Sequence, residues 1–142
     1  MGRDMGIIDA MTVPRPASLD DVATRALSGE AFDPLLREFL DSFYGQSVDG
    51  MASAITRAPA QIDTIHDAYL AAVAEHLALR FGLAVPPWVD EPHRFLSKPF
   101  FAGGLEDLKA ILLVESPLAF RRRQIFVSAN ALSRPREVPP PQ

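Results

Sequence analysis

The chain contains one long segment with a regular helical pattern, Ile62-Asp-Thr-Ile-His-Asp-Ala-Tyr-Leu-Ala-Ala-Val-Ala-Glu-His-Leu-Ala-Leu-Arg-Phe-Gly82. Its larger apolar side chains recur every three or four residues and share one broad stripe of a helix: Ile62, Ile65, Tyr69, Val73, Leu77 and Phe81. Alanines occupy many of the other positions, and glycine is the residue type that most often follows the end of a helix. The segment therefore predicts the central core helix of an all-α fold.

Three shorter helices are predicted on its N-terminal side. Ser18-Leu-Asp-Asp21 combines a capping serine with acidic residues in the first turn, and the helix that it starts should end at Gly29. Asp33-Pro34 is a second start signal, with a capping aspartate and a proline in the first turn, and Gly45 closes that segment. Residues 47–57 predict a third, weaker helix.

The C-terminal side has a different character. Val85-Pro-Pro-Trp-Val89 should be extended, because tandem prolines oppose a helix. Residues 91–96 predict a short helical turn, and residues 105–115 a further main helix. Ser116-Pro117 should start a last short helix with Ser116 as its cap, followed by a short extended piece at residues 125–127.

These elements predict an all-α fold with a single compact domain of about five to six helices, an extended Pro/aromatic segment and flexible termini. At 142 residues the chain has the length of one domain with a hydrophobic core of its own. We expect a flexible N-terminal arm at residues 1–16, a helical domain at residues 17–134 and a disordered, proline-rich tail at residues 135–142.

Composition excludes several classes of site. The chain has no cysteine, which rules out disulfides and thiolate metal sites. Two of the three histidines, His66 and His76, lie roughly 15 Å apart along one predicted helix, so they cannot share a metal. No nucleophile motif is present. We therefore expect no catalytic residues, no metal and no cofactor.

The charges are distributed unevenly. Residues 17–91 carry 12 acidic and 4 basic side chains, a net charge of −8, whereas residues 92–142 carry 4 acidic and 8 basic ones, a net charge of +4. A nucleic-acid binder is usually basic overall. The asymmetry favours a protein partner or self-association, although solvated surface charge would explain it equally well. No apolar run is long enough to span a membrane and no secretory signal is visible, so a cytoplasmic location is expected.

A partner-binding surface is predicted from Arg121, Arg122 and Arg123. Three consecutive residues of a helix point about 100° apart, so at least one or two of these arginines should face solvent or an acidic partner. In the alternative, one arginine supports a neighbouring carboxylate and the others are solvated. The aromatic residues Trp88, Phe100 and Phe101 either add to the binding surface or form a hydrophobic lid on the helices.

Residues 85–134 resemble a class of uncharacterised small helical proteins of actinobacterial type, which occur in antitoxin-like or regulatory contexts. The resemblance is carried by these residues: Trp88, Arg94-Phe-Leu96, Pro99-Phe-Phe101, Glu115-Ser-Pro-Leu-Ala-Phe-Arg-Arg-Arg123 and Ile125-Phe-Val127. It implies no catalytic residue. Some members of the class appear with a separate DNA-binding helix-turn-helix, which this chain does not show.

Three functions are consistent with these patterns. The first is a non-enzymatic protein-interaction module, antitoxin-like, whose partner is a protein such as a toxin. The second is a DNA-binding transcriptional regulator that uses the basic C-terminal segment against phosphates. The third is a small enzyme with a site assembled from separated residues such as His66, His93 and Asp90.

Overall fold

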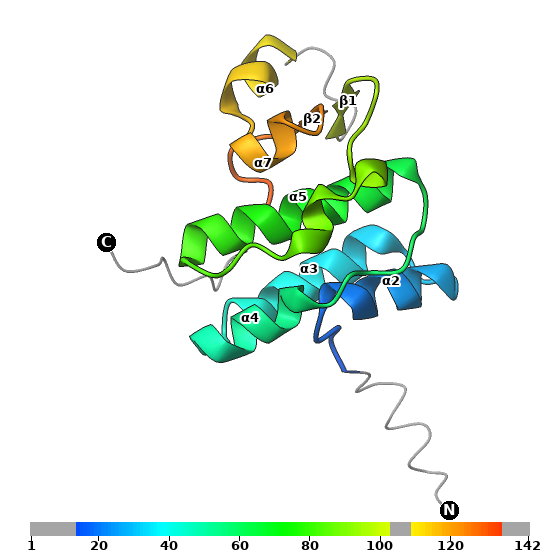
Figure 1. Cartoon of the computed structure of the whole chain (residues 1–142), viewed down its shortest axis with the longest axis vertical. Helices are drawn as coiled ribbons and strands as arrows, with labels where there is room; N and C mark the ends of the chain where they lie inside the picture. Colours follow the sequence, from blue (N-terminus) through cyan, green and yellow to red (C-terminus); the bar gives the residue numbers. More distant parts are fainter. Residues whose placement is uncertain (1–13, 103–108, 135–142) are drawn as a thin grey trace, which may run out of the picture.

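A computed structural model describes residues 14–102 and 109–134 of the chain. Within these residues the fold is built from six α-helices, two 3-10 helices and two strands of two residues each (Figure 1). Their bounds are α2 Leu19–Leu27, α3 Phe32–Phe43, α4 Val48–Thr56, α5 Thr64–Phe81, η1 Pro87–Asp90, η2 Pro92–Arg94, β1 Phe100–Phe101, α6 Lys109–Glu115, α7 Leu118–Arg121 and β2 Ile125–Phe126. The predicted all-α, single-domain fold is confirmed.

Helices α2, α3 and α4 form a layer on one side of α5 (Figure 1). Two of them begin at serine caps, since Ser18 Oγ accepts from the backbone N–H of Asp21 at 3.0 Å and Ser47 Oγ from that of Gly50 at 3.2 Å. The predicted cap at Asp33 is wrong. Helix α3 already begins at Phe32, so Asp33 lies within the first turn, where its carboxylate still favours the helix dipole.

Helix α5 is the central element, as the sequence predicts. It is capped by Asp63, whose carboxylate accepts from the backbone N–H of His66 at 2.8 Å, and it is followed by Gly82 in the left-handed region with φ of 67°. Its middle is buried on nearly all sides, because layers pack against opposite faces. The alanines are core residues that let neighbouring helices approach closely, whereas Ile65 of the predicted stripe is 37% exposed.

The elements from η1 to β2, which we call the C-terminal layer, cover the opposite side of α5 (Figure 1). The tandem prolines are not extended throughout, because Pro87 opens the 3-10 helix η1 and a proline suits the first position of a helical turn. Strand β1 pairs in parallel with β2, with Phe100 opposite Ile125 and Phe101 opposite Phe126. None of the described helices combines the length and hydropathy needed to cross a membrane.

Ser116 has a different role from the predicted cap. The residue that precedes helix α7 is Pro117, which has no side-chain hydrogen bond to offer. The buried Ser116 hydroxyl instead accepts from the backbone N–H of Val127 at 2.8 Å and lies 2.9 Å from its carbonyl oxygen. It therefore joins the end of α6 to the chain that follows β2.

The predicted arm and tail lie largely outside the described residues. At the N-terminal boundary, Pro16 is buried and the carbonyl oxygen of Pro14 accepts from Nη1 of Arg25 at 2.8 Å, so residues 14–16 contact the domain. At the C-terminal boundary, Arg134 donates to the carboxylate of Asp41 at 2.8 Å. The described chain is thus attached to α2 and α3 at both of its ends.

Burial in this core should make stability depend on pH in the alkaline range. It raises the pKa of Tyr69 to about 12, with a further contribution from the Asp33 carboxylate. Because the folded-state pKa is raised, this stability is present below the unfolded pKa of about 10 and is lost as pH rises towards 12. Between pH 9 and pH 11 the free energy of unfolding of the wild type should fall by about 1 kcal/mol more than that of a Tyr69→Phe variant. Urea unfolding at both pH values measures the difference, and parallel losses would contradict the assignment.

Candidate partner-binding surface

The three adjacent arginines occupy three different environments. Arg121 ends helix α7 and is exposed, and no described residue pairs with its side chain. The side chain of Arg122 is 35% exposed, and that of Arg123 is fully buried. The prediction that at least one or two of them face solvent is confirmed, but burial removes Arg123 from any partner-binding surface.

Arg123 holds the C-terminal layer against α5. Its Nη1 donates to Oε1 of Glu75 at 2.7 Å and to the carbonyl oxygen of Ala119 at 2.8 Å, and its Nη2 donates to that of Val89 at 2.7 Å. Burial lowers the pKa of Arg123, while the hydrogen bond to Glu75 acts in the opposite direction. One guanidinium thus connects α5, η1 and α7.

Arg122 shares the same carboxylate. Its Nε donates to Glu75 at 3.1 Å and its Nη2 donates to Asp90. Burial disfavours its charge, but these two hydrogen bonds outweigh that cost and raise the pKa of Arg122. The guanidinium groups of Arg122 and Arg123 also lie over the ring of Phe95, at 5.0 and 4.7 Å from its centre. Arg122 therefore already pairs with two carboxylates of this protein, and these pairs compete with any carboxylate of an outside partner.

A second buried arginine, Arg94, was not predicted from the sequence. Its guanidinium lies 4.7 Å from the centre of the Trp88 ring and donates to the carbonyl oxygens of Pro59 and Asp67, at 3.0 and 3.3 Å. Its Nε lies 3.2 Å from Glu91. The nearest signal in the sequence is the spacing of Glu91 and Arg94 around a proline turn, which does not reveal the distant carbonyl groups.

The aromatic residues behave mainly as a lid. Trp88 is 6% exposed and its Nε1 donates to the carbonyl oxygen of Ile55 at 3.0 Å, so it cannot contact a partner in this conformation. Phe100 and Phe101 are half-buried, and Phe101 stacks on Phe126 with ring centres 5.0 Å apart. The structure does not join these three aromatic side chains and the arginines into one exposed patch.

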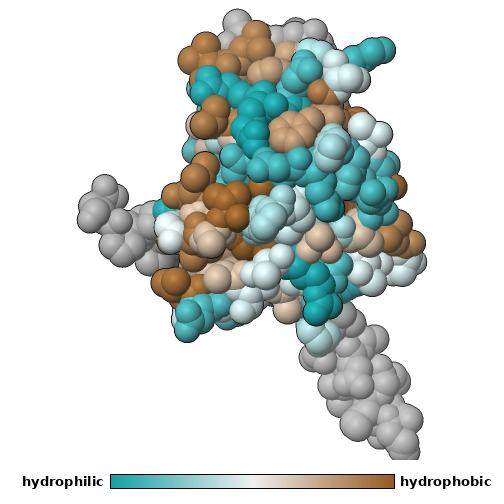
Figure 2. Space-filling model, in the orientation of Figure 1, coloured by the Kyte–Doolittle hydropathy of each residue, from teal (hydrophilic) through white to brown (hydrophobic). Residues whose placement is uncertain are grey.

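Exposed aliphatic side chains are concentrated in the sequence of α6 and α7. Four such residues fall within eight positions, with exposed fractions of 49% for Ile111, 47% for Leu113, 77% for Val114 and 59% for Leu118. We call these four residues, with the neighbouring Arg121, the α6–α7 surface. Figure 2 shows hydrophobic surface at the top of the molecule, where Figure 1 places α6.

The sequence contained a signal for this surface. Ala110-Ile-Leu-Leu-Val114 is a continuous aliphatic run, and consecutive residues of a helix cannot all face one side. In α6 only Leu112 of the aliphatic residues from 111 to 114 is buried. An aliphatic run on a short helix at the edge of a domain therefore predicts exposed apolar side chains.

The residues considered for an enzyme do not converge. His66 pairs with Asp63 at 2.8 Å, whereas Asp90 pairs with Arg122. His93 lies 3.7 Å from Glu91 and lines a separate hollow from the cavity that His66 borders. The described part of the chain contains no group of three histidine or acidic residues placed to hold a metal ion.

Comparisons with protein-family models, curated proteins and solved structures found no match to this chain.

Proposed function

We propose that the chain is a non-enzymatic protein-interaction module, antitoxin-like, that binds a partner protein and neutralises or regulates it. The observation that carries the proposal is the concentration of exposed aliphatic side chains on the α6–α7 surface. Val114 is 77% exposed and Leu118 is 59% exposed. Clustered apolar side chains of this kind are typical of protein interfaces, because burying them on binding is favourable.

The charges around this surface indicate the chemistry of the partner. Arg121 lies three residues after Leu118 and is exposed, whereas Arg122 and Arg123 are hydrogen-bonded to carboxylates of this chain. A complementary partner would present an apolar patch with a carboxylate at its edge. The aliphatic side chains would supply most of the affinity, and Arg121 would mainly affect orientation and association rate.

The alternative of a DNA-binding regulator has less support. This alternative requires the three arginines to contact phosphates. Of the three, Arg122 and Arg123 instead pair with carboxylates of this chain, and only Arg121 does not. Binding to a duplex usually requires several phosphate contacts. The net charge of −4 would also oppose it.

A single substitution with a matched control tests the proposal. Val114→Asp places a charge on the most exposed aliphatic residue of the α6–α7 surface, whereas Val48→Asp changes another valine, 64% exposed, on helix α4. Both variants should fold normally. A partner is first recovered from native extract with the wild type and then purified. Val114→Asp should bind it more than about tenfold more weakly than the wild type does, whereas Val48→Asp should bind it with the affinity of the wild type.

Several outcomes would contradict the proposal. Equal affinity of wild type and Val114→Asp for the recovered partner would exclude the α6–α7 surface as its binding site. Tight, salt-dependent binding to duplex DNA that is lost in an Arg121→Gln variant would instead support the regulator. The purified partner should also lose or change its activity when the wild type is added, and no change would remove the regulatory role.

A further inference from the structure

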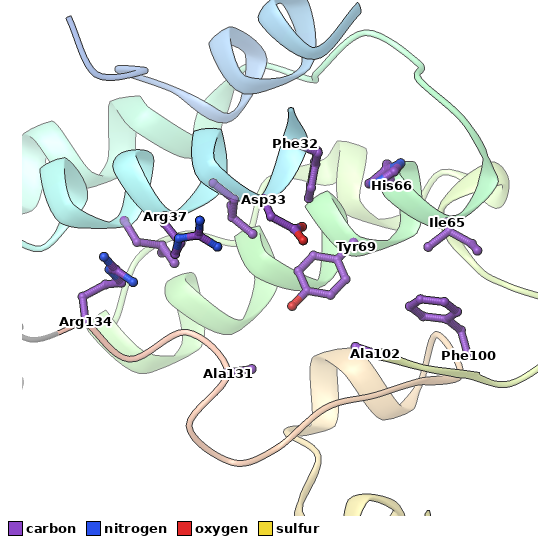
Figure 3. A pocket seen from close by; sticks show the side chains of 12 residues that line it. Phe32, Asp33, Arg37, Ile65, His66, Tyr69, Phe100, Ala102, Ala131 and Arg134 are labelled. Atoms are coloured by element: carbon purple, nitrogen blue, oxygen red, sulfur yellow. The ribbon is translucent and has the colours of Figure 1, made fainter. Parts of the chain in front are cut away.

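A second feature lies on a different part of the molecule, away from the α6–α7 surface. A cavity of about 420 Å³ opens between α3, α5 and two segments of the C-terminal layer, which contribute Phe100 and Ala131 (Figure 3). A volume of this size is within the range of small-molecule sites. The four contributing segments are far apart in the sequence, so the cavity exists only in the folded chain.

One part of the cavity wall is apolar and rich in aromatic rings. Phe32 packs edge-on to Tyr69 with ring centres 6.2 Å apart and lies 4.3 Å from the ring of His66. Leu36 lines the cavity from α3, and Phe100 lines it from β1. Aromatic walls favour a flat apolar group, because stacked and edge-on contacts add to the gain from burial.

Two opposite charges stand at the cavity without partners of their own. Asp33 and Arg37 are one turn apart on α3 and both line the cavity. Among the described residues neither makes a hydrogen bond or an ion pair, although the neighbouring charged groups are paired, Arg134 with Asp41 and His66 with Asp63. Figure 3 shows the Asp33 carboxylate above the Tyr69 ring and the Arg37 side chain between Asp33 and Arg134.

Tyr69 adds a neutral hydrogen-bond donor to the cavity. Burial, with the Asp33 carboxylate, raises the pKa of Tyr69 to about 12, so its hydroxyl stays protonated near neutral pH. No described residue accepts a hydrogen bond from it. Beside its aromatic rings the cavity thus presents the Asp33 carboxylate, the Arg37 guanidinium and a phenolic hydroxyl, and Arg134, which pairs with Asp41, also lines it.

We infer that this cavity binds a free aromatic amino acid, with its carboxylate at Arg37, its ammonium at Asp33 and its ring against the apolar wall. The two charges on α3 match the two charges of a zwitterion. A ligand with a single charge would leave one of them without a counterpart. This inference is independent of the proposed partner-binding function, because no residue of the α6–α7 surface lines the cavity.

Binding can be tested on the full chain by calorimetry or ligand-detected NMR with L-phenylalanine and L-tryptophan as the probes. At least one of them should bind saturably with a Kd below about 1 mM, a modest affinity for a ligand of this size. Two analogues separate the charges: 3-phenylpropanoate lacks the ammonium and phenethylamine lacks the carboxylate. Each should bind at least about tenfold more weakly than L-phenylalanine.

Variants locate the site. Arg37→Gln and Asp33→Asn should each weaken binding by about tenfold or more, whereas Arg57→Gln and Glu38→Gln, which alter exposed charges outside the cavity, should leave it unchanged. All four positions are exposed, so the variants should fold, and circular dichroism checks this.

The inference is overturned if neither amino acid binds at about 10 mM, a concentration that would detect even a very weak complex. It is also overturned if either single-charge analogue binds as tightly as L-phenylalanine. Equal effects of Arg37→Gln and Arg57→Gln would place the binding elsewhere. None of these results affects the test of the α6–α7 surface, so failure of one proposal is distinguishable from failure of the other.

Discussion

A Leu77→Asp variant is expected to be unfolded at room temperature. Leu77 has no exposed surface and lies on α5, which is packed between the α2–α4 layer and the C-terminal layer. The substitution removes a buried leucine, which alone costs about 2 to 5 kcal/mol, and adds a carboxylate with no partner. Domains of this size are stable by only about 5 to 15 kcal/mol. Circular dichroism and thermal melting measure the result.

The same helix provides the control. Leu79 is two residues away and 57% exposed, so Leu79→Asp introduces the same charge at the surface. Its melting temperature should stay within a few degrees of the wild type, since a surface substitution usually changes stability by less than about 0.5 kcal/mol. A cooperatively folded Leu77→Asp variant with near-native stability would show that α5 is not the central core helix.

Local signals predicted the helices well. Ser18 and Gly82 act at helix ends through contacts with residues at most four positions away, so the sequence contains everything that decides them. The error at Asp33 is of the same local kind and shifts the helix start by only one or two residues. The recurrence of large apolar side chains every three or four residues likewise identified α5 without knowledge of its neighbours.

The strand pairing could not be predicted in the same way. Strands β1 and β2 are two residues long, and their pairing joins Phe100 to Ile125 across 25 positions. Nothing local requires either segment to be a strand. Gln124, just before β2, has φ of 62°, a conformation that a residue other than glycine adopts only when the surrounding structure favours it.

The candidate site shows the same limit more sharply. Arg121, Arg122 and Arg123 are identical in type and adjacent, so the sequence predicts that some are exposed but cannot say which. The groups that hold the buried Arg123 are distant in the sequence. Glu75 lies 48 positions away from it, and Val89, whose carbonyl group accepts from it, lies 34 positions away. The exposed aliphatic residues of α6 were visible as a run in the sequence, but their exposure depends on what the C-terminal layer leaves uncovered.

Replacing each arginine in turn by methionine should give a steep gradient of stability. Arg123→Met should cost about 3 to 5 kcal/mol, because it leaves Glu75 with one fewer charged partner and leaves the buried carbonyl groups of Ala119 and Val89 without their donors. Arg121→Met should change stability by less than about 0.5 kcal/mol, and Arg122→Met by about 1 kcal/mol, because its pairs are partly exposed. Urea unfolding at pH 7 measures all three.

The gradient also decides how binding must be tested. A triple replacement of the arginines would remove the support that Arg123 gives to the fold, so a loss of binding in that variant would say nothing about the surface. A double-mutant cycle checks the cause: Glu75→Gln and Arg123→Met together should cost about 1 to 3 kcal/mol less than the sum of their separate effects, because they share one interaction. Strict additivity, or an Arg123→Met variant as stable as Arg121→Met, would show that the buried pair does not hold the C-terminal layer to α5.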